Sequence, residues 1–289
     1  MQKRSAEEIT KLLIDFAKQD ERVRAVLLNG SRANPLAIVD EYQDFDIVFI
    51  VSHIGNFTSD HEWVNVFGEI IIQQLPDEMV IGERDQNGFA YLLLFADGNR
   101  IDLTLFPVEK VANNYWPDSY TLCLLDKDRI FSALPLPNDS SYLILKPSEK
   151  EFLDTCNEFW WVSTYVAKGL MRNEITYAKG MMEKVVRPMF MRLIEWKIGI
   201  ENNFTVVFGK EGRFIKRYLA DDLYRKILTT YADHDVQRNW QALFIMTEVF
   251  SEVARDVGMR LHFTYNLEED EKVGAWLKEQ YNYAKIDKR

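Results

Sequence analysis

The chain has 289 residues, of which 47% are hydrophobic and 28% charged, a balance typical of a globular protein with one large domain or two ordinary ones. Its formal net charge of −10 disfavours a nucleic-acid polymer as the main partner, because proteins that bind phosphate backbones usually present a basic surface. The two cysteines, Cys123 and Cys156, lack the paired spacing of a disulfide framework or a zinc site.

The first residues turn acidic before any apolar run develops, and no later run is long enough to cross a membrane. We therefore expect a cytoplasmic protein without a membrane partner. The negative charge suits a cationic small molecule as the substrate.

In chain order, the apolar spacing within residues 6–19 predicts an amphipathic helix. Short runs rich in β-branched and aromatic residues then predict strands at 23–28, 45–51, 70–72, 89–95 and 101–106. The Asp97-Gly98 step predicts a hairpin turn between the last two strands, and residues 60–68 are predicted to form a helix.

Residues 107–147 contain five prolines, which predicts irregular connecting chain. Ser148 and Glu151 fit a capping box that begins a helix. The periodicity that follows predicts helices at 149–171, 174–199 with a break or kink at Pro188, 211–231, 236–257 and 268–284. The expected fold class is α+β, in which a small mixed β-sheet domain with flanking helices, residues 1–147, precedes an all-α helical bundle domain, residues 148–289.

Asp44 and Asp46 lie one residue apart at the start of an apolar strand, so their side chains point to the same face. The run 47–51 that follows predicts a central strand buried on both faces, where unpaired acids are costly. Asp102 lies on a later strand and faces the same way if the two strands are neighbours. Like charges about 4 Å apart repel by roughly 4 kcal/mol at an effective dielectric near 20. A strand with one solvated face is the simpler explanation of an isolated acidic pair, but three aspartates together favour a magnesium site for phosphoryl transfer.

Gly30-Ser31-Arg32 follows an apolar strand, at a place where backbone amides and a hydroxyl can bind phosphate oxygens. Taken alone, the Gly-Ser pair is more often an ordinary turn.

A second group of polar and aromatic residues repeats at spacings of four and three along the predicted helix 149–171, so its members share one face. The group consists of Asp154, Glu158, Trp161, Tyr165 and Lys168. Such a stripe commonly faces water, but aromatic rings among acids also suit a cleft wall that binds a cationic, sugar-like ligand. In that case Asp154 and Glu158 would bind its guanidinium or ammonium groups.

The Gly-Ser turn, the acidic pair twelve residues later and the aspartate on a further strand resemble the nucleotidyltransferase superfamily that includes DNA polymerase beta. Longer segments are similar to the aminoglycoside 6-adenylyltransferases, the streptomycin-modifying group. These are Leu28-Asn29-Gly30-Ser31-Arg32, Gln43-Asp44-Phe45-Asp46-Ile47, Asp102-Leu103-Thr104-Leu105, Leu125-Asp126-Lys127-Asp128, Cys156-Asn157-Glu158-Phe159-Trp160, Tyr165-Val166-Ala167-Lys168-Gly169-Leu170, Arg172-Asn173-Glu174, Val186-Arg187-Pro188 and Phe214-Ile215-Lys216-Arg217-Tyr218-Leu219. The likeness covers most of the chain.

This resemblance implies an enzyme that transfers AMP from ATP to a hydroxyl of streptomycin and releases pyrophosphate. It makes residues 1–147 the nucleotidyltransferase domain and residues 148–289 the substrate-binding domain. It also implies two magnesium ions bound by Asp44, Asp46 and Asp102. Lys168 resembles a helical-domain lysine that contacts the triphosphate in related enzymes, which adds it to Gly30, Ser31 and Arg32 as a nucleotide-binding residue.

In this hypothesis Asp102 is the first choice for proton acceptor and Glu158 the second. Two alternatives stay open at this point. The acceptor could be a lincosamide or another aminoglycoside hydroxyl, and the chain could be a non-catalytic nucleotide-binding regulatory protein of the same fold. The presence of all three aspartates favours catalysis over the regulatory alternative.

Overall fold

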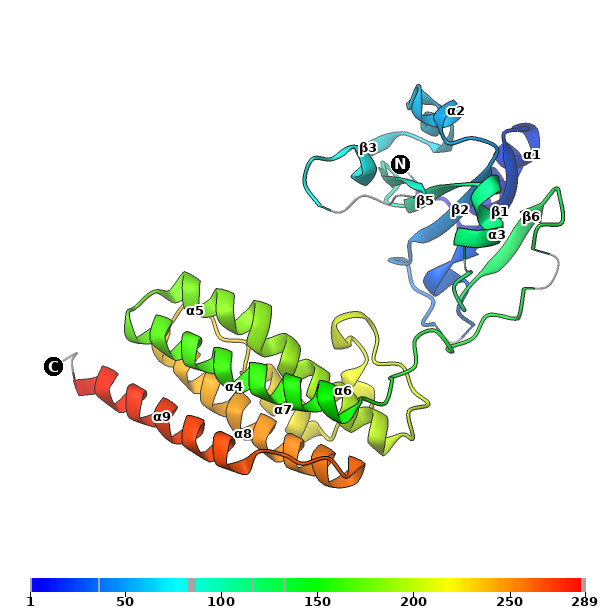
Figure 1. Ribbon diagram of the computed structural model, residues 1–289. Coiled ribbons are helices and arrows are strands. Elements are labelled where there is room, and N and C mark those ends of the chain that lie inside the picture. Colours follow the sequence, from blue (N-terminus) through cyan, green and yellow to red (C-terminus); the bar gives the residue numbers. More distant parts are fainter. Residues whose placement is uncertain (1, 36, 83–86, 116, 132–133, 287–289) are drawn as a thin grey trace. The chain divides into compact units, whose positions relative to one another are not determined.

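The computed structural model describes residues 2–35, 37–82, 87–115, 117–131 and 134–286, which divide into two compact units, 1–141 and 142–289 (Figure 1). The first unit combines a β-sheet with helices, and the second is built from helices. The predicted α+β fold class is therefore confirmed. The units divide a few residues before the expected boundary at 147.

A mixed sheet of six strands forms the centre of the first unit, in the order β3-β4-β5-β2-β1-β6. The strands are β1 (Val23–Asn29), β2 (Phe45–Val51), β3 (Ile70–Gln74), β4 (Phe89–Phe95), β5 (Arg100–Pro107) and β6 (Leu122–Asp126). β2 and β5 run parallel, whereas the other neighbouring pairs run antiparallel. The five predicted strands are confirmed, and β2 lies in the middle of the sheet.

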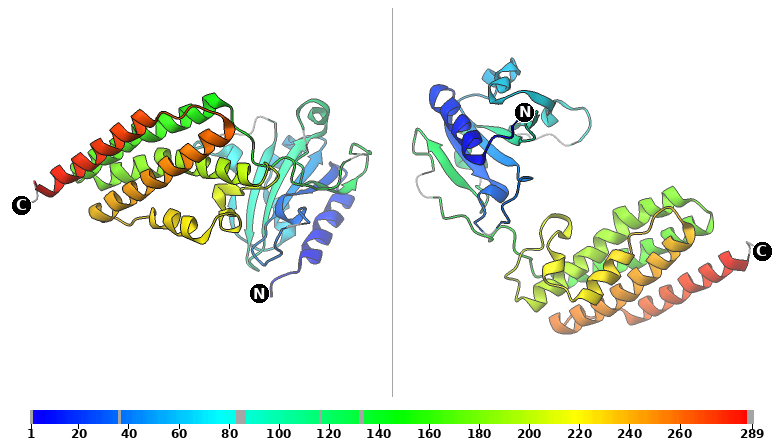
Figure 2. Two further views of the ribbon diagram at one scale, coloured as in Figure 1. Left: turned by 90° about the horizontal axis from the view of Figure 1, so that it is seen from below. Right: turned by 180° about the vertical axis from the view of Figure 1, so that it is seen from behind.

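β2 is buried on both faces, as its sequence predicts. Phe45, Ile47 and Phe49 belong to the core on the face that α1 (Ala6–Gln19) covers, whereas Val48 and Ile50 lie in a smaller cluster on the opposite face. The start of α3 (Val108–Asn114) packs against that second cluster. Figure 2 shows α1, in dark blue, along one side of the sheet. A charged side chain at the start of such a strand therefore sits beside apolar surroundings, which makes its ionisation costly.

Two predictions for the first unit are wrong in part. The region 107–147, expected to be irregular, contains α3 and the edge strand β6. Most β6 side chains are half-buried, and its sequence lacks the alternation of apolar and polar residues by which strands are recognised. The helix expected at 60–68 is a 3₁₀ helix, Glu62–Phe67, which ends at Gly68 and follows the short α2 (Gly55–Thr58). Another 3₁₀ turn spans Pro76–Glu78.

The predicted hairpin turn between β4 and β5 is confirmed, and it also holds the beginning of the chain. Gly98 adopts φ +80°, and its amide donates to the Phe95 carbonyl at 2.8 Å. The Asp97 side chain, 1% exposed, accepts from Arg4 Nε at 2.5 Å and from Asn99. These bonds, that of Arg4 first, hold the pKa of Asp97 well below its usual range. The turn is therefore linked to Arg4, two residues before α1, by a largely buried ion pair.

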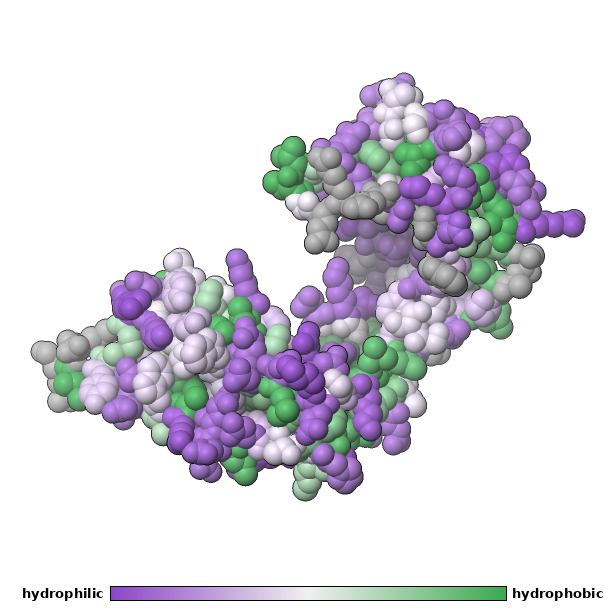
Figure 3. Space-filling model, viewed as in Figure 1, coloured by the Kyte–Doolittle hydropathy of each residue, from purple (hydrophilic) through white to green (hydrophobic). Residues whose placement is uncertain are grey.

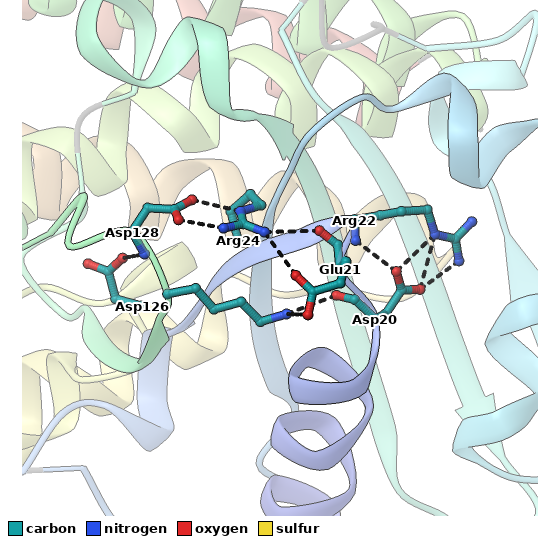
Figure 4. A network of polar contacts seen from close by, with 7 residues as sticks. Asp20, Glu21, Arg22, Arg24, Asp126 and Asp128 are labelled. Carbon is teal, nitrogen blue, oxygen red and sulfur yellow. Dashed lines mark hydrogen bonds and ion pairs between the residues drawn. The ribbon is translucent and has the colours of Figure 1, made fainter.

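A network of charged residues connects the end of α1, the start of β1 and the end of β6 (Figure 4). Arg22 Nη2 lies 2.6 Å from Asp20 Oδ2, and Arg24 Nε donates to Asp128 Oδ2 at 2.6 Å. Lys127 Nζ donates to the Asp20 carbonyl at 3.1 Å. The network therefore lies at the opposite end of β1 from Asn29.

The helical unit contains α4 (Glu149–Met171), α5 (Ile175–Met181), α6 (Arg187–Glu201), α7 (Asp221–Thr229), α8 (Val236–Leu261) and α9 (Leu267–Ile286). The long helices α4, α8 and α9 run side by side in both views of Figure 2. The capping box that begins α4 is confirmed, because Ser148 Oγ accepts from the Glu151 amide and the Glu151 carboxylate accepts from the Ser148 amide. In the part of the chain that the structure describes, no helix is long and apolar enough to span a membrane.

The predicted break near Pro188 takes the form of a π-helical turn. Met182–Val186 forms this turn between α5 and α6, and α6 begins at Arg187. Because proline has no amide hydrogen, it cannot donate the next helical hydrogen bond, and the wider turn before it accommodates the change of spacing.

The helix predicted at 211–231 is wrong in its first half. Two 3₁₀ turns, Lys210–Gly212 and Ile215–Arg217, precede α7, which begins only at Asp221. Gly209, Glu211 and Gly212 all have positive φ angles. A right-handed helix cannot contain that backbone conformation, so the segment is a folded loop.

Candidate active site

The turn after β1 brings the chain directly against an aspartate. Gly30, the first residue of the 3₁₀ turn Gly30–Arg32, has φ +69°. A Cβ atom on Gly30 would lie 2.2 Å from Asp46 Oδ2, so a side chain at this position would require the Asp46 carboxylate to move. Asn29, just before it, is paired with Asp46 in the register of β1 and β2. Glycine is therefore favoured at position 30 both by the backbone conformation and by the approach of the Asp46 carboxylate.

The parallel register of β2 and β5 places Asp46 opposite Asp102. Asp44 stands immediately before β2. Burial raises the pKa of Asp46 to about 6, and the charges of Asp102 and Asp44 contribute to the increase. Burial also raises the pKa of Asp44, with Arg100 opposing the shift and Asp102 adding to it. The structure thus brings the three predicted aspartates close enough for their charges to repel.

Arg100, at the start of β5, lies among these carboxylates. Its Nε and Nη2 atoms donate to the two oxygens of Asp102 at 2.8 and 2.7 Å, and its Nη1 atom is 3.8 Å from Asp44 Oδ2. Within the described residues, no group of three His, Cys, Asp or Glu side chains is placed to hold a metal ion. The positive charge beside Asp102 in this structure is a guanidinium, and the three-aspartate metal site stays a prediction.

Arg32 holds the Gly-Ser turn against the beginning of β2. Its Nε and Nη2 atoms donate to the main-chain carbonyls of Asp44 and Gln43 at 3.0 and 2.7 Å. Its guanidinium lies 3.8 Å from the centre of the Phe45 ring. Burial lowers the pKa of Arg32, and the nearby carboxylates oppose that shift. In this structure Arg32 thus positions the turn, and the nucleotide-binding role of Gly30, Ser31 and Arg32 stays a prediction.

The five predicted residues on α4 lie along one face of that helix, and four of them are exposed. Trp161 Nε1 donates to the Tyr165 hydroxyl at 2.9 Å, and Lys168 Nζ is 5.1 Å from the centre of the Tyr165 ring. Asp154 forms an ion pair with Lys150, one turn earlier. The apolar residues on the opposite face of α4 are buried, as expected. In Figure 3 the visible surface of this helical unit is largely hydrophilic, with scattered apolar patches.

The predicted residues thus form two groups in two different units. Gly30, Ser31, Arg32 and the three aspartates belong to the first unit, and the α4 residues belong to the second. Sequence reasoning assigned no role to Arg100. A usable signal was present, since Arg100 precedes Asp102 by two residues on one strand and therefore shares its face.

The buried central strand β2 carries Asp46 beside the Gly-Ser turn, and its parallel neighbour β5 carries Asp102, which is the arrangement that the resemblance to nucleotidyltransferases implies. The family model described as streptomycin adenylyltransferase matches residues 3–280. The chain therefore belongs to the streptomycin adenylyltransferase family and is an adenylyltransferase. The resemblance inferred from the motifs is confirmed.

Several similar proteins carry the name aminoglycoside 6-adenylyltransferase. The one from Campylobacter jejuni is 39% identical over 277 residues, which cover 96% of this chain and 96% of that protein. The one from Bacillus subtilis (strain 168) is 38% identical and covers 91% of this chain and 93% of its own length. A crystal structure of an aminoglycoside 6-adenyltransferase from Bacillus subtilis is 34% identical, covers 96% of this chain and 99% of that chain, and has a TM-score of 0.47.

Proposed function

We propose that this adenylyltransferase transfers AMP from ATP to a hydroxyl group of streptomycin and releases pyrophosphate. The family match and the names of the similar proteins support an aminoglycoside as the acceptor. The proposal rests on the strand register that places Asp46 opposite Asp102, with Asp46 also beside Gly30. This register gathers carboxylate oxygens at a turn suited to binding phosphate. Because the reaction consumes ATP, we place it in the cytoplasm.

We propose that Asp44, Asp46 and Asp102 hold two magnesium ions, because their carboxylates are the ligand type that a hard divalent cation takes. The donor set consists of carboxylate oxygens, which magnesium prefers, and burial together with mutual repulsion already disfavours ionisation of Asp46. When bound, magnesium would neutralise part of the triphosphate charge and lower the pKa of the acceptor hydroxyl.

The proposed reaction is a displacement at the α-phosphorus of ATP. The acceptor oxygen forms a bond to that phosphorus, and the bond between the α-phosphorus and the bridging oxygen breaks with its electron pair passing to pyrophosphate. We propose that Asp102 accepts the proton of the hydroxyl, with Glu158 as the second candidate. The backbone amides of Gly30 and Ser31 bind phosphate oxygens, while Arg32 and Lys168 add positive charge for the nucleotide.

We propose that the helical unit binds the aminoglycoside through the exposed face of α4. Asp154 and Glu158 provide negative charge for guanidinium or ammonium groups, and the rings of Trp161 and Tyr165 provide apolar faces for a sugar. The hydrogen bond from Trp161 to Tyr165 fixes the relative orientation of the two side chains, which lowers the conformational entropy lost on ligand binding.

The test is pyrophosphate release by purified protein mixed with ATP, magnesium and streptomycin, followed by mass spectrometry of the product. We expect streptomycin to gain one AMP group, mapped to one hydroxyl. Transfer to a lincosamide or to another aminoglycoside, with none to streptomycin, would contradict the proposed acceptor and leave adenylyl transfer intact. ATP binding without pyrophosphate release from any acceptor would contradict catalysis.

A further inference from the structure

We propose that Arg100 is the internal counter-ion of the acidic site, and that a divalent cation binds by displacing its guanidinium from Asp102 and Asp44. The inference rests on the proposed function, since it assumes that the aspartates bind a metal ion. It assigns a role to a residue that neither the motifs nor the family match identifies.

The geometry places one guanidinium against two of the three aspartates. The fork of Nε and Nη2 holds both oxygens of Asp102, and Nη1 reaches to 3.8 Å from Asp44. The charge of Arg100 also lowers the pKa of Asp46, the most strongly shifted of these carboxyl groups. Arg100 therefore occupies the electrostatic position that a bound cation would take, and both oxygens of Asp102 are engaged while it stays there.

The second arginine whose charge acts on these carboxylates cannot replace Arg100. The guanidinium of Arg32 donates to two main-chain carbonyls and packs on the Phe45 ring. Its charge therefore acts on the carboxylates only through longer-range electrostatic attraction. Moving Arg32 would release the turn that positions Gly30. Moving the Arg100 side chain breaks side-chain contacts only, because among the described residues its hydrogen bonds go to the Asp102 carboxylate and none goes to the main chain.

The contact is also accessible enough to exchange. The side chains of Arg100 and Asp44 are 44% and 39% exposed, and that of Asp102 is 23% exposed. Water solvates both partners when such an exposed pair separates, which limits the free energy that even a two-pronged contact contributes. A divalent cation attracts the same carboxylates with twice the charge, so it can displace the guanidinium at a modest cost in affinity.

Two roles for Arg100 lead to opposite effects on metal binding. A residue that only orients Asp102 would strengthen the metal site, and its removal would weaken binding. A counter-ion that competes with the metal would weaken the site, and its removal would strengthen binding. The direction of the change therefore decides between the two roles without any measurement of turnover.

The experiment is a titration of the full chain with Mn²⁺ as the probe at fixed ionic strength. The electron paramagnetic resonance signal of the free ion measures how much Mn²⁺ is bound. We expect Arg100→Gln to bind Mn²⁺ about threefold to fivefold more tightly than the wild type, the upper part of the range that loss of an exposed competing ion pair allows. Without metal, we expect Arg100→Gln to have a lower melting temperature than the wild type, and saturating Mn²⁺ to reduce that difference.

Arg24→Gln is the matched control. Arg24 also forms an ion pair with an aspartate at the edge of the same sheet, but it lies at the far end of β1 (Figure 4). Its removal changes the net charge by the same amount, and we expect Mn²⁺ affinity to stay within about twofold of the wild type because screening weakens charges beyond about 10 Å.

Arg100→Lys tests whether the effect on Mn²⁺ binding arises from the contact of Arg100 with Asp102 or only from the positive charge at position 100. Lysine keeps the positive charge but cannot form the two-pronged contact with Asp102, so we expect Mn²⁺ binding tighter than in the wild type and weaker than in Arg100→Gln. Equal affinity of Arg100→Lys and the wild type would show an effect of charge alone and overturn the inference. This variant also serves if Arg100→Gln does not fold.

Unchanged or weaker Mn²⁺ binding by Arg100→Gln, in a wild type that binds Mn²⁺, would overturn the counter-ion role and leave the proposed metal site intact. Absence of Mn²⁺ binding by the wild type and by every variant would instead overturn the proposed metal site itself, and the inference with it. The two failures are therefore distinguishable in one set of titrations.

Discussion

At the scale of single residues, Gly30 shows how one position is constrained by its backbone and by a distant side chain at once. Its positive φ alone would tolerate another residue at a cost of about 1–2 kcal/mol. The Asp46 carboxylate, brought against it by strand pairing, would have to move to make room for even a methyl group. The two constraints have different consequences, because strain lowers stability whereas displacement of Asp46 changes the site.

Gly30→Ala and Gly98→Ala separate these two constraints. Gly98 also has a positive φ, but a Cβ there would have nothing within 4 Å. We expect both variants to lose about 1–2 kcal/mol of unfolding free energy from backbone strain, measured by urea denaturation. Only Gly30→Ala should also lose adenylyl transfer, by at least tenfold, because Asp46 must move. Equal pyrophosphate release by the two variants would refute a functional need for the close approach.

Asp46→Asn tests the proposed role of the carboxylate whose pKa burial raises to about 6. Removing its charge relieves repulsion from Asp44 and Asp102, so we expect the folded protein without metal to be at least as stable as the wild type. Turnover should fall by orders of magnitude, because catalysis depends on the charge at this position. Asp128→Asn, at the far end of the sheet, serves as the control and should keep turnover. Near-normal turnover of Asp46→Asn would show that this carboxylate is not needed.

At the scale of elements, α4 illustrates a helix whose beginning is determined locally and whose two faces serve different purposes. The capping box at Ser148 satisfies amides at its first turn, and the buried stripe attaches it to the bundle. The opposite face is left for polar and aromatic side chains. The hydrophobic stripe therefore determines which residues are presented to solvent.

Ser148→Ala should cost about 1 kcal/mol of stability, because the Glu151 amide loses its acceptor. Ser148→Asp keeps an acceptor at the same position and should retain most of that stability. Urea denaturation of both variants beside the wild type measures the difference. If the two substitutions were equally destabilising, the side-chain cap would not be the source of the effect.

At the scale of the whole molecule, the two units have separate hydrophobic cores and different stabilising devices. The first unit joins the beginning of the chain to the β4–β5 turn through Arg4 and Asp97. Because the pKa of Asp97 is depressed in the folded protein, the contribution of this ion pair is fully present above the ordinary pKa of 3.8. It is lost as the pH falls from there toward the folded value.

Asp97→Asn should therefore destabilise the protein by about 1–3 kcal/mol at pH 7, because Arg4 loses a charged partner in a largely buried pair. The difference from the wild type should shrink progressively below about pH 4, as wild-type Asp97 becomes protonated. Unfolding by urea at pH 7 and at pH 3 measures both values. A difference that stayed constant between these pH values would contradict the electrostatic explanation.

Features that depend on neighbouring residues could be read from the chain alone. The run after Asp46 predicted a central strand, Asp97-Gly98 predicted the hairpin, and Ser148 with Glu151 predicted the start of α4, since each pattern acts over a few residues. The loop at 209–220 could not be predicted, because positive φ angles at Gly209, Glu211 and Gly212 override the helical periodicity there. β6 is recognisable mainly through its pairing with β1.

The amino-acid sequence by itself determined the family, the α+β fold class and the identity of the three aspartates, because motifs and periodicity are local properties of the chain. The tertiary structure alone decided that Asp46 lies opposite Asp102, that its carboxylate lies against Gly30, and that Arg100 holds Asp102. Strand order and register bring together residues far apart along the chain. Distances and charges between such residues arise only when the sheet forms, which is why the counter-ion of the acidic site became visible only in the fold.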